Sequence, residues 1–386
     1  MSINAIKKDN ILTILLFFLY SSFILSFTKI PYSNVFYVLK FIFLLSYIIM
    51  FIFLNKNSII MSKQNILLFF LLSFFSGVPT LIVNSTITDT LNLILLIIIY
   101  LPLILIVFPN VDQNLMKKSL KLMYVSLLIF IIWPSLILTY FNQFYYLQAG
   151  RYRFISYFNN PNELAQFSLV FLLLSFYYLF IEKSSIKKYI WNLLFGCSSF
   201  YIILLTGSRA VLLAISIFVI IYFSTVIFHI EKKQRNFIFM FTFLIILLVL
   251  FSNYLLERNT GVLSYIDQLS SYRLSIWREI LKYKNPLLFL IGGYLQSHKQ
   301  YQVITNAYVE LFGNYGLIGL ICWCLTLLNF SVNKRVSTKF DKYKTAAICA
   351  YLVYYLFESG MQNIVNISSF FFWFTLCVGK MSSKGN

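Results

Sequence analysis

Long apolar runs alternate with short polar loops along almost the whole chain. Each run holds about 20 residues, enough to cross about 30 Å of hydrocarbon at about 1.5 Å per residue in a helix. The pattern therefore predicts an all-α polytopic integral membrane protein with about 12 transmembrane helices. The expected spans are 11–28, 35–54, 65–83, 91–108, 119–141, 161–181, 189–206, 209–228, 237–255, 305–328, 345–363 and 367–380.

The composition supports this class of protein. A chain of 386 residues that is 60% hydrophobic and 11% charged, with a mean hydropathy of +0.81, is not a soluble domain. The net charge of +19 would suit nucleic-acid binding, but lysines that set membrane topology explain it more simply. We therefore expect membrane lipid as a partner and no nucleic acid. Lys7 and Lys8 resemble the start of a signal peptide, but no cleavage site follows, so the first run is expected to remain as a helix.

The two kinds of basic residue separate between alternate loops. One set of alternate loops holds 20 of the 31 basic residues, and 18 of those 20 are Lys. Because Lys-rich loops stay in the cytoplasm, both termini are expected there. We expect a single transmembrane helical domain, residues 1–386, with no internal repeat. Its outer loops are expected at about 141–160 and, between the ninth and tenth spans, at about 256–305.

The loops on the far side hold ten basic residues, of which six are Arg. Arg in these loops runs against the topology rule and needs another reason. Its planar fork binds phosphate and carboxylate bidentately. The pattern predicts an outward-facing site for an anionic substrate that the membrane delivers. The six are Arg151, Arg153, Arg209, Arg258, Arg273 and Arg278.

The first candidate cluster precedes the sixth span. Asn160 is a suitable helix cap, Pro161 suits the first helical position, and Glu163 completes a capping box. This local role does not explain Arg151 and Arg153. Since a helix N-terminus itself favours anions, arginines beside it predict a phosphate clamp.

The second cluster is a predicted tight outer turn at 206–209. Arg209 stands in the first turn of a helix that begins outside, where a cation meets the positive end of the dipole at a cost of about 0.3–1 kcal/mol. An Arg near hydrocarbon costs more still. A bound anion would offset both costs, so Arg209 is the strongest single candidate.

The third cluster covers the large outer loop and the tenth span. Residues 272–282 have the periodicity of an interfacial helix that carries Arg273 and Arg278, although snorkelling from the interface explains both arginines equally well. Asn306, Glu310 and Gly313 follow i, i+4, i+7 spacing, so the outer end of the span is expected to present polar groups inward. Glycines at 313, 316 and 319 would permit close helix approach.

These clusters, in this order, resemble the O-antigen polymerase and O-antigen ligase superfamily of bacterial envelope enzymes, bacterial polysaccharide polymerases among them. The resemblance covers roughly residues 150 to 330, and each motif alone is weak. The matching pieces are Arg153 with Phe158-Asn-Asn-Pro-Asn-Glu-Leu-Ala165, Thr206-Gly-Ser-Arg209, Tyr272-Arg-Leu-Ser-Ile-Trp277, Pro286 with Gly292-Gly293, and Asn306-Ala-Tyr308 running into Gly316-Leu-Ile-Gly319.

The resemblance implies a metal-independent, GT-C-like glycosyltransferase without cofactors in the plasma (inner) membrane. Its donor would be a glycan on undecaprenyl diphosphate at the outer, periplasmic face, and a chain-length regulator protein is a possible partner. The residues implied to bind the diphosphate are Arg153, Arg209 and Arg273, with Arg151 beside them. The residues implied to position substrate are Asn162, Glu163, Asn306 and Tyr308.

One departure bears on the chemistry. Ligases of this superfamily tend to carry His-Asn where this chain has Thr305-Asn306, and that His is the candidate activator of the acceptor hydroxyl. Its absence favours a polymerase over a ligase and leaves the general base open. The candidates are His298, Glu310, Glu257 and Asp267.

The leading hypothesis is a polymerase that extends a lipid-linked O-antigen or capsule glycan by whole repeat units. A ligase that moves glycan onto lipid A core or protein is the first alternative. A flippase for the lipid-linked glycan is an alternative of another class. A transporter, however, should place charges near mid-membrane and show internal symmetry, whereas here the charges crowd the outer ends.

Overall fold

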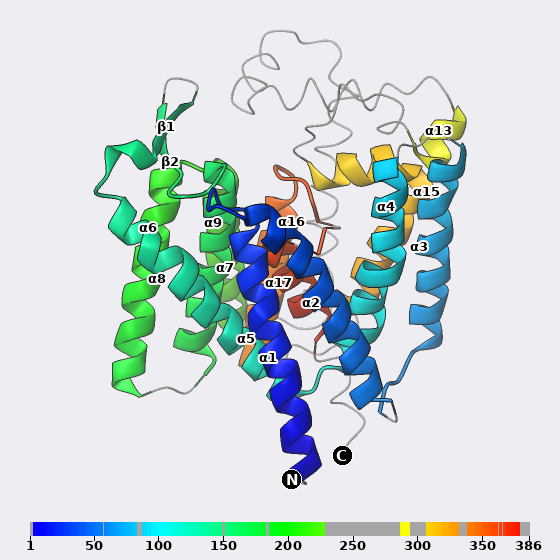
Figure 1. The fold of residues 1–386 in the computed structure, drawn as a ribbon, viewed down its shortest axis with the longest axis horizontal. Coiled ribbons are helices and arrows are strands. Elements are labelled where there is room, and N and C mark those ends of the chain that lie inside the picture. The colour runs from blue at the N-terminus through cyan, green and yellow to red at the C-terminus, as the bar shows by residue number, and fades with distance from the viewer. Residues whose placement is uncertain are drawn as a thin grey trace.

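The computed structural model describes residues 3–56, 58–82, 87–148, 151–182, 185–227, 286–293, 306–331, 338–361, 363, 364 and 366–378. Helices make up most of these residues (Figure 1). The helices are α1 Ile3–Leu25, α2 Ser33–Leu54, α3 Lys63–Ile82, α4 Ile87–Leu95, α5 Gln113–Leu127, α6 Trp133–Leu138, α7 Pro161–Phe180, α8 Ile186–Thr206, α9 Arg209–Ile227, α13 Pro286–Ile291, α15 Ala307–Ser331, α16 Lys339–Tyr354 and α17 Ile367–Cys377. The strands are β1 Tyr145–Gln148 and β2 Arg151–Phe154.

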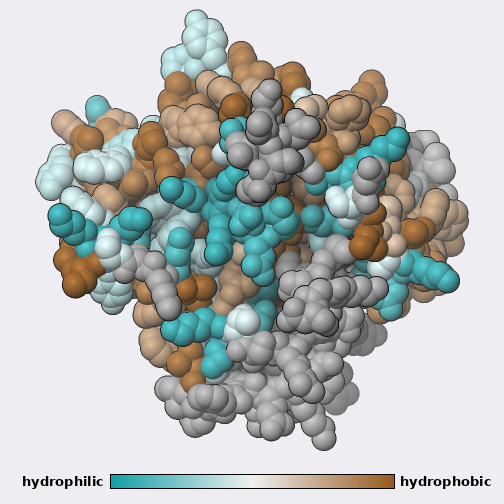
Figure 2. Space-filling model, turned by 90° about the horizontal axis from the view of Figure 1, so that it is seen from below, coloured by the Kyte–Doolittle hydropathy of each residue, from teal (hydrophilic) through white to brown (hydrophobic). Residues whose placement is uncertain are grey.

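Seven of the described helices are long and apolar enough to cross a membrane, so the chain is a helical, multi-pass membrane protein. Seen from below, hydrophilic side chains form a band across the molecule, and hydrophobic side chains lie mainly above this band in the view (Figure 2). The seven are Ser33–Leu54, Thr90–Asn110, Gln113–Leu138, Pro161–Phe180, Ile186–Thr206, Arg209–Val226 and Ala307–Ser331.

Helices occupy every predicted span, in whole or in part, except 237–255, which lies outside the described residues. The predicted spans 91–108 and 119–141 are not regular α-helices along their whole length. Their helices pass through π-helical turns at Leu96–Tyr100, Leu103–Val107 and Leu128–Ile132, next to Pro102 and Pro134. Because proline removes an N–H from the helical ladder, the neighbouring turns adjust to pair the freed carbonyls. The total of 12 spans and the cytoplasmic placement of both termini remain predictions.

The two ends of the bundle differ in chemistry. The hairpin β1–β2 lies at one end and the start of α1 at the other (Figure 1). At the α1 end, the Nζ of Lys118 lies 2.9 Å from the Oδ2 of Asp9, which links α5 to α1. Lys118 therefore lies at one end of the bundle, and Arg153 on β2 lies at the other.

The predicted loop at 141–160 contains two short strands that the sequence analysis did not predict. Strands β1 and β2 pair there as an antiparallel hairpin, with Tyr146 opposite Arg153 and Leu147 opposite Tyr152. Tyrosine and phenylalanine favour extended backbone, and polar and aromatic residues alternate with the period of a strand. The sequence pattern that indicates these strands was present, but each strand has only four residues.

The predicted span 305–328 is not one helix. Within α15, Gly316 has φ 65° and ψ −170°, which breaks the helical ladder. The part before the break lies across the upper end of the bundle, and the part after it runs down (Figure 1). The break brings the backbone of Gly316 against Gly292, a contact at which neither residue has room for a side chain.

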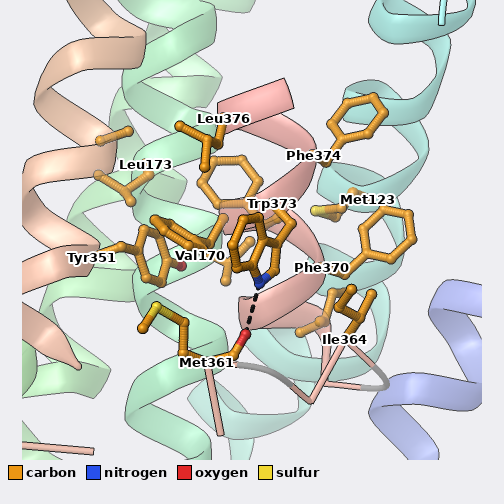
Figure 3. Close-up of a cluster of buried hydrophobic side chains, with 14 of the residues drawn as sticks. Met123, Val170, Leu173, Tyr351, Met361, Ile364, Phe370, Trp373, Phe374 and Leu376 are labelled. Atoms are coloured by element: carbon orange, nitrogen blue, oxygen red, sulfur yellow. Dashed lines mark hydrogen bonds between the residues drawn. The ribbon is translucent and has the colours of Figure 1, made fainter. Parts of the chain in front are cut away.

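Helix α17 lies in the middle of the bundle and is buried along its whole length. Its 11 residues extend only about 16 Å, too short to cross a bilayer. Non-helical backbone joins it to α16, and such backbone survives at membrane depth only where protein covers it. A buried side chain pairs with a backbone carbonyl of this segment: the Nε1 of Trp373 donates to the carbonyl of Met361 at 2.7 Å (Figure 3).

Candidate functional site

Arg153 joins three parts of the hairpin end of the bundle. Its Nε donates to the carbonyl of Thr206 at 2.7 Å, and its Nη2 donates to the Oδ1 of Asn162, also at 2.7 Å. The hairpin, the start of α7 and the turn between α8 and α9 thus meet at one guanidinium. Both acceptors are neutral, so these two bonds orient the group without cancelling its charge.

The turn at 206–209 has the geometry expected from the sequence. Gly207 ends α8 with φ 62°, a left-handed conformation that glycine adopts without strain. A Cβ at Gly207 would lie 3.8 Å from the Nε of Arg153, so the side chain of Arg153 passes directly over the turn. Helix α9 then begins at Arg209, which is exposed. The structure therefore brings the first and second predicted clusters together.

Asn160 caps the start of α7 as predicted, but the predicted capping box with Glu163 is not formed, because the Asn160 side chain accepts from Asn162 instead. The Oδ1 of Asn160 accepts from the backbone N–H of Asn162 at 2.9 Å, and Pro161 occupies the first helical position. Two helix N-termini, those of α7 and α9, consequently point toward the arginine side of the site, and both favour bound anions.

The segment before α7 is held by the connection between α1 and α2. The backbone N–H of Lys29 donates to the carbonyl of Tyr157 at 2.8 Å, and Thr28 pairs with Phe158. Phe158 is fully buried and packs against Phe167 of α7, with the ring centroids 5.4 Å apart. Burial raises the pKa of the Tyr157 hydroxyl, so this group stays neutral and able to donate.

A second set of polar contacts connects α7 and α15 to the segment that links α16 to α17. The Nδ2 of Asn366 donates to the Oε1 of Gln166 at 2.9 Å. The backbone N–H of Gly360 donates to the Oε2 of Glu310 at 2.9 Å, and Ser369 donates to the Gly360 carbonyl at 2.7 Å. Glu310, a candidate base, therefore already binds the backbone of the linking segment.

Asn306 and Tyr308 form the capped start of α15. The Oδ1 of Asn306 accepts from the N–H groups of Tyr308 and Val309, and its Nδ2 donates to the Leu356 carbonyl at 2.8 Å. The Tyr308 hydroxyl donates to the carbonyl of Leu352 at 2.9 Å. Asn306 is completely buried and Tyr308 nearly so, and these contacts dock α15 onto the end of α16. Their predicted role in positioning substrate remains a prediction.

Several predicted site residues lie outside the described part of the structure. The backbone of Arg151 is described, opposite Gln148 in the hairpin, but its side chain is not. The predicted interfacial helix at 272–282 is not described either. The other predicted residues outside the described part are Arg258, Arg273, Arg278, His298, Glu257 and Asp267.

The sequence analysis missed Lys40, which is buried in the first half of α2. Its Nζ lies 3.9 Å from the ring centroid of Tyr37, 5.0 Å from that of Phe27 and 5.6 Å from that of Phe41. It also donates to the Oγ of Ser26 at 3.4 Å. The signal was available, because Lys40 is the one charged residue within the predicted span 35–54.

No protein-family model matches the sequence, and no curated protein matches it either. Within the described ranges, no group of three or more His, Cys, Asp or Glu side chains is placed to hold a metal ion. The chemistry of the site must therefore be argued from its residues.

Proposed function

We propose that this protein is a glycosyltransferase of the plasma membrane that polymerises lipid-linked oligosaccharide repeat units for O-antigen or capsular polysaccharide. The donor would be a glycan on undecaprenyl diphosphate, presented at the outer, periplasmic face. The observation that carries the proposal is the position of Arg153, a cation held between the N-terminus of α7 and the 206–209 turn. That is an anion site at the end of a membrane bundle, where a lipid diphosphate would arrive.

The proposed arrangement has about 12 spans with both termini inside. The Lys118–Asp9 pair at the end opposite the hairpin supports that orientation, since lysines gather on the cytoplasmic side. The large loop between the ninth and tenth spans would contribute Arg273 from outside the described residues.

In the proposed reaction an acceptor sugar hydroxyl attacks the anomeric carbon of the donor. The bond from that carbon to the diphosphate oxygen breaks, and the electron pair leaves with the diphosphate. Negative charge on the leaving group grows during this step, and Arg153 and Arg209 would stabilise it from fixed positions. Preorganised cations of this kind serve the transition state better than the ground state.

The test in the native host is Arg153→Ala and Arg209→Ala, with long-chain polysaccharide read on gels. We expect both to lose long chains while the protein level in the membrane is unchanged. Lys187→Ala is the matched control, because Lys187 is an exposed cation at the opposite end of α8. Unchanged long chains in both arginine variants would refute the site.

A transporter of the same lipid-linked glycan is a second candidate, and one observation favours it. Discontinuous helices with exposed termini are common in transporters, and α15 is broken at Gly316 while α17 is short and central. The two functions differ in where single lipid-linked units accumulate after the gene is deleted. A flippase defect leaves them in the cytoplasmic leaflet, whereas a polymerase defect leaves them in the periplasmic leaflet. A ligase is separated from both by complementation of ligase-null and polymerase-null strains.

A further inference from the structure

Side chains join helices α5 and α8 on the outside of α7. The hydroxyl of Tyr124 on α5 donates to the Oδ1 of Asn192 on α8 at 2.9 Å. Nearer the hairpin end, the ring of Trp133, which begins α6, lies 6.0 Å from that of Phe195 on α8. Tyr124 also stacks on Phe171 of α7, with the ring centroids 4.6 Å apart. Helix α7 therefore lies behind the junction of the other two.

Three exposed lysines lie on the α1 side of this junction, at helical spacing from the residues that form it. On α8, Lys188 precedes Asn192 by four residues. On α5, Lys121 precedes Tyr124 by three, and Lys117 precedes Lys121 by four. Residues three or four apart share one side of a helix, so both helices present lysines on the sides that meet at the junction. We call Lys117, Lys121 and Lys188 the lysine face.

The lysine face has no anionic partner in the described part of the chain. Lys118, which lies between the two lysines of α5 in sequence, pairs with Asp9 of α1 instead. Within the described residues, no salt bridge involves a member of the lysine face. The exposed carboxylate of Glu182 follows α7 at this end of the bundle and is outnumbered by these lysines. The lysine face is therefore open to an external anion.

Membrane topology alone does not require this arrangement. Lysines that keep a loop in the cytoplasm act from any position near the end of a span. Here they come from two helices, next to aromatic side chains on the outside of the bundle. Trp191 is 57% exposed and stacks on Phe195, and Trp133 is 51% exposed. Cations beside an apolar, Trp-bearing surface match a phospholipid, with its phosphates at the lysines and its acyl chains along the rings.

We propose that the lysine face binds a phospholipid of the cardiolipin class, whose headgroup carries two phosphates. Lys117 and Lys121 of α5 bind one phosphate, and Lys188 of α8 binds the other. The acyl chains lie against Trp191 and Trp133. The bound lipid bridges α5 and α8 and stabilises their junction. This role goes beyond the proposed glycosyl transfer and does not depend on it.

The test uses the purified full-length protein in detergent, with cardiolipin, phosphatidylglycerol and phosphatidylcholine of matched acyl chains as probes. Native mass spectrometry counts the bound lipids, and a titration gives the affinity for each. We expect the wild-type protein to bind cardiolipin about tenfold or more tightly than phosphatidylcholine, with phosphatidylglycerol between them. Raising the salt concentration should weaken the binding of cardiolipin, because the lysines are exposed.

Paired substitutions separate a site from general surface charge. Lys121→Ala with Lys188→Ala removes one cation from each helix and should weaken cardiolipin binding by about tenfold. Arginine at both positions should keep the binding. Lys56→Ala with Lys63→Ala is the matched control, because it removes two exposed lysines from the connection between α2 and α3, on the far side of the bundle from α8 (Figure 1). This control should bind cardiolipin as wild type does.

Two outcomes in these titrations would overturn the inference. One is equal weakening in the two alanine pairs, which would mean that only net charge matters. The other is a wild-type protein that binds cardiolipin no more tightly than phosphatidylcholine.

A third measurement leaves every lysine in place, so it holds even where the alanine pair fails to fold. Cardiolipin with brominated acyl chains, added to the wild-type protein, should quench tryptophan fluorescence more than brominated phosphatidylcholine does. Trp191→Phe should remove part of that quenching. Equal quenching by the two lipids, or unchanged quenching in Trp191→Phe, would place the lipid elsewhere and refute the site. None of these results depends on whether the protein forms polymer.

Discussion

Gly292 and Gly316 approach each other so closely that a Cβ on either residue would lie 2.5 Å from the backbone nitrogen of the other. Both have positive φ, 86° and 65° respectively. The N–H of Gly293 donates to the carbonyl of Asn314 at 3.0 Å beside this contact. The break in α15 therefore packs directly against the backbone that follows α13. This backbone contact fixes how the start of α15 lies across the bundle.

Alanine at either glycine should weaken this backbone contact and lower the stability of the protein. We expect Gly316→Ala and Gly292→Ala each to lower the free energy of unfolding by at least about 1–3 kcal/mol, from the strained φ and the backbone clash together. Thermal unfolding of the purified protein in detergent measures this loss of stability. Gly77→Ala is the control, because the nearest atom to a Cβ there is the Cδ2 of Leu93 at 3.9 Å. A melting temperature for Gly316→Ala at or above that of Gly77→Ala would contradict the close approach.

Asn162 offers a way to cancel the charge of Arg153 without removing it. In Asn162→Asp the new carboxylate keeps the geometry of the amide and forms a charge-assisted bond to the guanidinium, next to a helix N-terminus that favours it. We expect unchanged or slightly raised thermal stability, with binding of undecaprenyl diphosphate weakened at least tenfold. If binding survives in a folded Asn162→Asp protein, Arg153 does not bind the diphosphate.

Lys40 should be replaceable by an apolar side chain of similar length. Burying a lysine in a helix that crosses the membrane costs about 2.5–3.5 kcal/mol, whereas its aromatic contacts return about 2 kcal/mol. Lys40→Met should therefore keep or raise thermal stability, and Lys40→Ala should lower it by leaving a space between Phe27, Tyr37 and Phe41. A Lys40→Met protein clearly less stable than wild type would contradict this balance and show that the cation itself stabilises the contacts with Phe27, Tyr37 and Phe41.

Trp373 tests the non-helical segment between α16 and α17. Trp373→Phe keeps one aromatic ring but removes the indole N–H and part of the buried volume. The loss of the donor to the buried carbonyl of Met361 alone should cost about 1–3 kcal/mol. Thermal unfolding in detergent again gives the measure. Trp191→Phe is the control, since Trp191 is 57% exposed and mainly stacks on Phe195. Equal losses in the two variants would mean that ring size, and not the hydrogen bond, matters at Trp373.

The sequence predicted best those features that depend on neighbouring residues. The cap at Asn160, the proline at the next position and the left-handed turn at Gly207 follow from local chemistry. Helices occupy the predicted spans within the described residues, in whole or in part, because apolar segments in a bilayer have few other ways to pair their backbone. The break at Gly316 was not predicted, since a glycine within an apolar run has the same pattern whether it packs or kinks.

The contacts that build the site are long-range and left no periodic signal. Arg153 and Thr206 are 53 positions apart, and Gln166 and Asn366 are 200 apart. The sequence could name Arg153 and Asn162 as polar residues near a helix start, but not that the Arg153 guanidinium donates to the Asn162 side chain. Nor could it show that Glu310 binds the backbone at Gly360. Those relationships depend on how α15, α16 and α17 fold back into the bundle.

The most direct test of the account is reconstitution with one substrate and no partner. Purified protein in lipid nanodiscs is given synthetic undecaprenyl-diphosphate repeat units, in buffer with chelator, and the products are separated by length. We predict a ladder of polymers that grows by whole units, releases undecaprenyl diphosphate and disappears in Arg153→Ala. A folded wild-type protein that binds the substrate but yields only single units would contradict the proposed function.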